Sequence, residues 1–111
     1  MNMIHWLTSR FSGHGKAISL YKRGMARAKK HDHQGALRDY TTAIEVPGAP
    51  TGLLAMVLYN RALVYVATGN ERKGAADLDA VLAMNEALVN VKTMARQKLA
   101  KIESRASKRN G

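Results

Sequence analysis

The sequence predicts an all-α protein of antiparallel helical hairpins, with about five helices in its 111 residues. Only two prolines occur, Pro47 and Pro50, and both lie in PGAPTG, the one strong break in the chain. Long segments on each side of this break are rich in Ala, Leu, Met, Lys and Arg and place apolar residues at helical spacing. No segment alternates apolar and polar residues as a half-buried strand would. Helices are therefore expected throughout.

The first half of the chain divides at its glycines and prolines. Residues 1–15 form an N-terminal segment that ends in a turn at 12–15, because two glycines fall there. The first helix is predicted over 16–30 and ends at the polar stretch KHDHQG. The second helix covers 34–45 and ends before the loop 47–52, because proline cannot continue a helix and glycine favours turns.

The second half continues in the same way. The third helix is predicted over 52–67 and ends at TGNERKG, after which the fourth covers 72–84. A fifth helix, 87–106, has one apolar side, and a basic tail follows at 107–111. The apolar positions are Leu88, Val91, Ala95, Leu99 and Ile102. Connections that are mostly short make successive helices antiparallel neighbours.

The chain also repeats itself, because residues 17–46 align with residues 55–84, an offset of 38 in the numbering. The five identical pairs are Ala17/Ala55, Leu20/Leu58, Tyr21/Tyr59, Arg23/Arg61 and Asp39/Asp77. Small residues match as well, with Gly24 opposite Ala62 and Ala36 opposite Gly74. The sequence therefore reads as two helix–turn–helix copies followed by one further helix.

These copies resemble the tetratricopeptide repeat family, in which small residues lie where two helices cross and larger ones fill the space around them. The matching positions are Leu20, Gly24, Ala36, Tyr40 and Ala43 in the first copy, and Leu58, Ala62, Tyr65, Gly74, Leu78 and Val81 in the second. Arg23 and Arg61 stand where the family has leucine. The resemblance implies an α-solenoid of a short bacterial type, with repeats at 16–46 and 53–86 and a capping helix at 87–106.

The resemblance also implies a function. In this family the first helix of each repeat lines a concave groove, which makes the protein a non-enzymatic interaction module for a peptide or a partner helix. The residues expected to bind are Tyr21, Met25, Met56, Tyr59, Asn60 and Leu63. Tyrosine recurs at equivalent positions of the two copies, and it offers a large contact area with a polar tip.

Signals for catalysis or metal binding are weak. The chain has no cysteine, which removes disulfides and thiolate sites. His31, Asp32 and His33 are expected to form an exposed polar turn, because a metal site usually needs three or four converging ligands. Gly13–Lys16 lacks the earlier glycine and the Ser or Thr of a phosphate-binding loop. Asp77 and Asp79, two apart on a helix, point to different sides. We therefore expect no enzyme, no cofactor and no metal.

The charge distribution supports other partners. The net charge is +10, with seven basic and one acidic residue in 1–33, four and six in 34–90, and seven and one in 91–111. The alternative function is therefore a basic adaptor that binds RNA, DNA or another polyanion through its charged ends. A third is a self-associating scaffold or homodimer, because Trp6 and Phe11 need cover. No apolar run approaches the roughly 20 residues that span a bilayer, so a cytoplasmic protein is expected.

Overall fold

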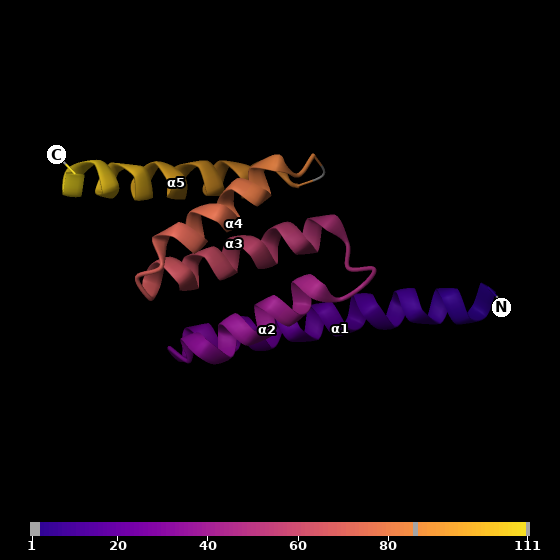
Figure 1. The fold of residues 1–111 in the computed structure, drawn as a ribbon. Coiled ribbons are helices and arrows are strands. Elements are labelled where there is room, and N and C mark those ends of the chain that lie inside the picture. The colour runs from indigo at the N-terminus through magenta and orange to yellow at the C-terminus, as the bar shows by residue number, and fades with distance from the viewer. Residues whose placement is uncertain (1–2, 86, 111) are drawn as a thin grey trace.

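The computed structural model describes the backbone of residues 3–85 and 87–110, and the side chains of residues 13–85 and 87–110. This part of the chain is all-α, which confirms the predicted fold class. Its helices are α1 (Met3–Lys29), α2 (His33–Glu45), α3 (Thr51–Ala67), α4 (Glu71–Ala83) and α5 (Val89–Asn110). Successive helices run antiparallel, so the chain forms two hairpins and a final helix (Figure 1).

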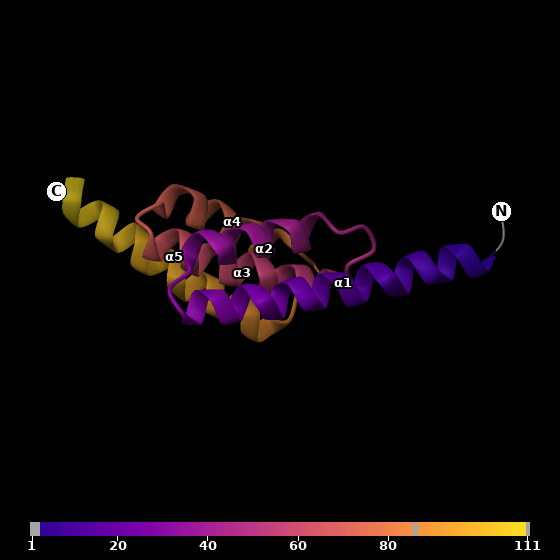
Figure 2. The same ribbon diagram turned by 90° about the horizontal axis from the view of Figure 1, so that it is seen from below.

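The helices form two layers. In one layer α3 lies between α1 and α5 and contacts both. The other layer holds α2, packed against α1 and α3, and α4, packed against α3 and α5 (Figures 1 and 2). Within the described residues each helix contacts only helices one or two places away along the chain. The odd-numbered helices therefore present one broad face that α2 and α4 do not cover.

Two apolar clusters make up the core, and each joins one hairpin to its neighbour. The first holds Tyr21, Ala36, Tyr40, Ala43, Val57 and Val64, from α1, α2 and α3. The second centres on Ala55, Leu58, Ala62, Leu78, Val81, Val91, Ala95 and Ile102, from α3, α4 and α5. Because α3 contributes to both clusters, it is the central support of the array.

The sequence repeat also relates the turns of the two hairpins. Asp32 caps α2 by accepting a hydrogen bond from the Gly35 amide, and Asn70 caps α4 by accepting one from the Lys73 amide. The residues before these caps both have positive φ, 64° at His31 and 85° at Gly69. Such a backbone favours glycine, and histidine is among the other residues that adopt it more often than most. Equivalent positions therefore build equivalent turns.

The structure differs from the sequence prediction at both ends of the chain. The helix expected at 16–30 begins at Met3, so the turn expected at 12–15 is wrong. A glycine costs a helix only about 1 kcal/mol, and Gly13 packs so close to the Pro47 carbonyl oxygen that no Cβ fits there. The first turns of α1 extend beyond the other helices (Figure 1). The side chains of Trp6 and Phe11 lie outside the described residues.

The basic tail expected at 107–111 is helical as far as Asn110. Two ion pairs hold this part of α5 against the start of α4. Arg105 Nε lies 3.2 Å from Glu71 Oε1, and Arg109 Nη2 lies 2.8 Å from Glu71 Oε2. These arginines lower the pKa of Glu71, the hydrogen bond from Arg109 most of all. The end of the chain is therefore part of the fold.

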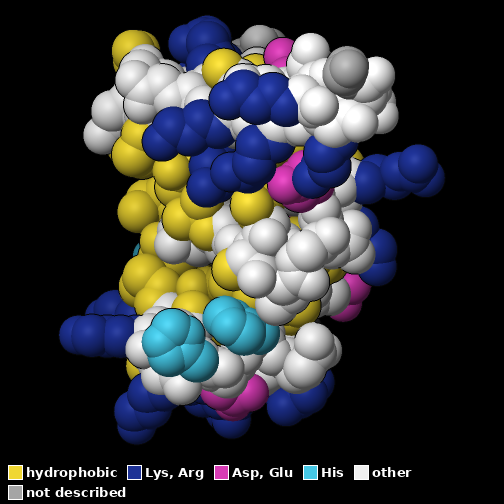
Figure 3. Space-filling view, turned by 90° about the vertical axis from the view of Figure 1, so that its left-hand side faces the viewer, with side chains coloured by type: hydrophobic (Ala, Val, Ile, Leu, Met, Phe, Trp, Pro, Cys, Tyr) yellow, Lys and Arg dark blue, Asp and Glu magenta, His cyan; other side chains and the backbone are white. Residues whose placement is uncertain are grey.

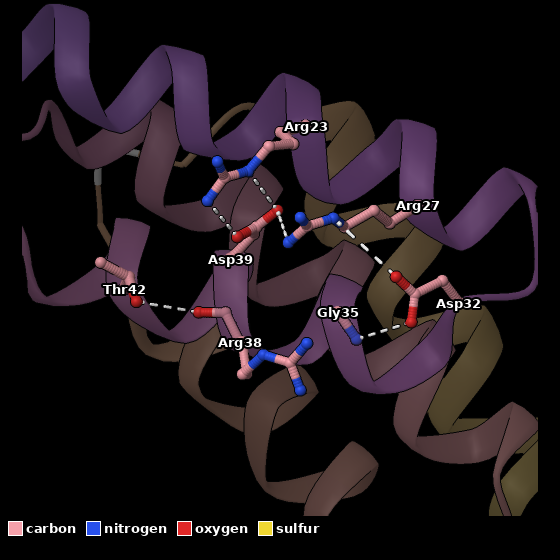
Figure 4. Close-up of polar contacts among 7 residues, drawn as sticks. All are labelled: Arg23, Arg27, Asp32, Gly35, Arg38, Asp39 and Thr42. Atoms are coloured by element: carbon pink, nitrogen blue, oxygen red, sulfur yellow. Dashed lines mark hydrogen bonds and ion pairs between the residues drawn. The ribbon is translucent and has the colours of Figure 1, made fainter.

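A bidentate Arg–Asp pair joins the two helices of each hairpin. Arg23 donates to both carboxylate oxygens of Asp39, each at 2.9 Å, and Arg27 adds a bond of 3.0 Å (Figure 4). In the second hairpin Arg61 donates to Asp77 at 2.8 and 2.7 Å. Both aspartates are buried, so each needs such a partner. Asp79, two residues later, is exposed, as its spacing predicts.

The pair in the first hairpin makes stability depend on pH. The hydrogen bonds from Arg23 hold the pKa of Asp39 below its ordinary value, against the opposing effect of burial. Because the folded pKa is lower than the unfolded one, Asp39 stabilises the fold above the unfolded pKa, and this contribution is lost as the pH falls through the folded pKa. Between about pH 5 and pH 2, Tm should fall more steeply for the parent than for Asp39→Asn. Parallel Tm curves would contradict this.

Overpacking the first cluster tests the assigned register. Ala36 is fully buried in it, so Ala36→Leu should lower the free energy of unfolding by roughly 1–3 kcal/mol. The matched control is Lys108→Ala on the exposed side of α5, which should change stability by less than about 0.5 kcal/mol. Urea unfolding followed by circular dichroism measures both. Equal effects would show that Ala36 is not at a tightly packed position.

Candidate functional site

The six residues expected to bind a peptide all lie on two neighbouring helices of one layer. Tyr21 and Met25 are on α1, and Met56, Tyr59, Asn60 and Leu63 are on α3. Their exposure differs. Met25 and Met56 expose 36% and 38% of their surface, Tyr59, Asn60 and Leu63 are half-buried, and Tyr21 is buried. The layer is therefore common to all six, but they do not contribute equally to its surface.

Tyr21 and Asn60 join α1 to α3. The Asn60 amide donates to the Tyr21 hydroxyl at 3.0 Å and to the Met56 carbonyl at 2.8 Å. The Tyr21 ring packs against Tyr40, with ring centroids 6.2 Å apart. Burial raises the pKa of the Tyr21 hydroxyl, and the hydrogen bond from Asn60 opposes this in part. These two side chains therefore fix the geometry of the layer, and direct contact with a ligand stays a prediction for them.

Among these six residues, the apolar side chains of Met25, Met56 and Leu63 lie outside both core clusters. Tyr59 lies beside them, packed against the second cluster. Hydrophobic side chains continue along one edge of the molecule from α1 to α5, the left-hand edge of Figure 3, where the odd-numbered helices lie. Methionine has a flexible and polarisable side chain, so a surface that carries two of them adapts to different apolar partners.

The same face continues onto α5, where its character changes from apolar to basic. On α3, Tyr59 and Leu63 each follow a buried residue, Leu58 and Ala62. On α5, Lys92 and Arg96 each follow a buried residue in the same way, Val91 and Ala95. Because α5 packs beside α3, Lys92 and Arg96 take the positions of Tyr59 and Leu63 one helix further along. We define the interaction face by Met25, Met56, Tyr59, Asn60, Leu63, Lys92 and Arg96.

Sequence reasoning left the register of Lys92 and Arg96 on the fifth helix open, so it did not assign them to this face. Leu58 and Ala62 of α3 correspond to Val91 and Ala95 of α5. The offset in numbering between these corresponding residues is smaller than the offset between the two hairpins. The reason is that no insertion like PGAPTG precedes α5, so aligning α5 at the offset of the hairpins gives the wrong register. A usable signal was present in the paired apolar and small residues at a spacing of four, Val91 with Ala95.

The other candidate residues form neither a metal site nor a phosphate-binding loop in the described part of the chain. The rings of His31 and His33 lie edge to face, with centroids 5.8 Å apart. Among the described residues, no group of three or more His, Asp or Glu side chains could hold a metal ion. Gly13 and Lys16 lie within α1, whose helical backbone leaves no phosphate-binding loop there.

Comparisons with known proteins add no assignment. No helix in the described part of the chain is both long and apolar enough to cross a membrane. The chain matches no protein-family model, no curated protein and no solved structure. What the interaction face binds must therefore be inferred from its own residues.

Proposed function

We propose that the protein is a non-enzymatic, cytoplasmic interaction module of the tetratricopeptide type, which binds a peptide or a partner helix across the interaction face. One observation carries this proposal. Met25, Met56 and Leu63 belong to neither core cluster, yet they lie on adjacent helices of the layer that α2 and α4 leave uncovered. Contiguous apolar side chains on a surface are a common mark of a protein-binding site.

The two-layer architecture supports the same proposal. A partner helix about 10 Å wide fits along a face made of parallel helices, with its apolar side chains inserted between theirs. The Tyr21–Asn60 hydrogen bond holds α1 and α3 in place before binding, which reduces the entropy lost when a ligand binds. The face is therefore suited to recognising an ordered segment of another protein.

The proposal is tested by placing a charge on the apolar part of the face. Leu63→Asp should weaken binding of a true face ligand by roughly 1–3 kcal/mol, because a carboxylate would replace an apolar contact there. The measurement is capture of proteins from a lysate of the native host, followed by titration of the captured partner. Ala76→Asp, on the exposed side of α4 in the other layer, is the matched control. Equal loss from both variants, or from neither, would contradict the proposal.

A polyanion-binding role is the second candidate, favoured by Lys101 and Lys108, which are exposed on α5 and form no ion pair with a described side chain. This role predicts the opposite ranking of variants. Reversing the charge of Lys101 and Lys108 would abolish RNA or DNA binding, and Leu63→Asp would have little effect. Affinity would also fall steeply with salt, whereas apolar contacts persist.

A further inference from the structure

Charge in this protein is separated between the two layers. The helices α1, α3 and α5 carry six, one and seven basic residues, which makes fourteen in this layer. The same three helices carry a single acidic residue, Glu103. The helices α2 and α4 together carry three basic and five acidic residues. The overall excess of positive charge therefore belongs to the layer that carries the interaction face.

Ion pairs remove part of this charge and leave the rest in two groups. Asp39, Asp77 and Glu71 together pair with Arg23, Arg27, Arg61, Arg105 and Arg109. Among the described side chains, eight further basic residues of the layer form no ion pair. They are Lys16, Lys22 and Lys29 on α1, and Lys92, Arg96, Lys98, Lys101 and Lys108 on α5. The helix between them, α3, carries no unpaired charge.

Four of these residues border the apolar part of the interaction face. Lys22 and Lys29 alternate with Ile18 and Met25 at spacings of four, three and four, so all four lie on one side of α1. Lys92 and Arg96 lie on the face itself, one residue after buried positions of α5. Lys101 precedes the buried Ile102 by one residue, so it lies on the opposite side of α5. An apolar strip on α1 and α3 therefore runs between two basic borders.

We propose that the occupant of this face is an acidic amphipathic helix of another protein. Its apolar side would contact Met25, Met56 and Leu63, and its carboxylates would lie toward Lys22 and Lys29 on one side and Lys92 and Arg96 on the other. A second copy of α1 does not fit, because α1 contains no acidic residue. A nucleic acid fits less well, because the strip is apolar and offers one half-buried ring, Tyr59, for stacking.

This inference rests on the proposed function and is tested with an unbiased peptide library. Random 16-residue peptides are displayed and selected on the immobilised full chain at about 150 mM salt, close to physiological ionic strength. We expect the enriched peptides to be acidic, with apolar residues recurring at helical spacing. Parallel selections use Lys92→Glu/Arg96→Glu and, as a matched control of the same helix and charge change, Lys101→Glu/Lys108→Glu. Circular dichroism verifies that each variant is folded.

The expected result is that an enriched peptide loses at least tenfold in affinity for Lys92→Glu/Arg96→Glu and less than twofold for Lys101→Glu/Lys108→Glu. Neutral or basic enriched peptides, acidic peptides without helical spacing, no enrichment, or an equal loss with both variants would each overturn the inference. So would displacement of the peptide by a 20-nucleotide RNA at 300 mM salt. If Leu63→Asp still binds every selected peptide, the proposed function fails as well. If Leu63→Asp loses affinity for selected peptides that are neutral, the face still binds apolar peptides, and only the acidic character of the partner is contradicted.

Discussion

Tyr40→Ala is expected to lower the free energy of unfolding by about 4 kcal/mol, because it empties the centre of the first cluster. Tyr40 exposes 1% of its surface and packs against Tyr21. The ring also fills the crossing of α1 and α2, where a methyl group on Gly24 would come within 2.6 Å of it. A domain of this size has roughly 5–15 kcal/mol of stability, so this loss would remove between about a quarter and most of it.

Urea unfolding followed by circular dichroism measures this loss. The control is Tyr40→Phe, which keeps the ring and should cost less than about 1.5 kcal/mol. Burial raises the pKa of Tyr40 to about 12, so the hydroxyl is neutral over the working range. A loss below about 1.5 kcal/mol for Tyr40→Ala would mean that the ring does not support the hairpin.

Arg61→Met should cause the second large loss, roughly 3 kcal/mol, because it leaves the Asp77 carboxylate buried without its partner. The equivalent change in the first hairpin, Arg23→Met, should cost less, because Arg27 still lies 3.0 Å from Asp39. The double variant Arg61→Met/Asp77→Leu should recover most of the loss, since no unpaired charge remains. Thermal unfolding of the four proteins, parent included, measures the differences. Equal losses for Arg61→Met and Arg23→Met would contradict the role of Arg27.

The sequence was sufficient for the hairpins because their signals are local. Pro47 and Pro50 mark the connection between them, and the internal repeat aligns Arg23 with Arg61 and Asp39 with Asp77. The partnership within each pair was not predicted. In the sequence, an arginine in place of an apolar residue is a departure from the repeat pattern. The structure gives its reason, because each arginine donates to an aspartate of the following helix.

The ends of the chain and the site were predicted less well, because tertiary contacts decide them. Gly13 and Gly15 indicate a turn locally, but α1 continues through them and Gly13 packs against the loop at Pro47. The end of α5 depends on Glu71, which belongs to α4 and is distant in the sequence. The register of Lys92 and Arg96 follows from which residues of α5 are buried, and the offset between the two hairpins gives a different register.

Contacts limited to near neighbours along the chain have a consequence for kinetics. Such a topology forms from short-range contacts, so folding on a microsecond-to-millisecond timescale is expected, and either hairpin can form first. For the same reason, α5 can detach while the α1–α2 hairpin stays folded, since stability in such arrays is nearly a sum over units and their interfaces. A ligand held by α1 on one side and α5 on the other would make the two ends of the array unfold together.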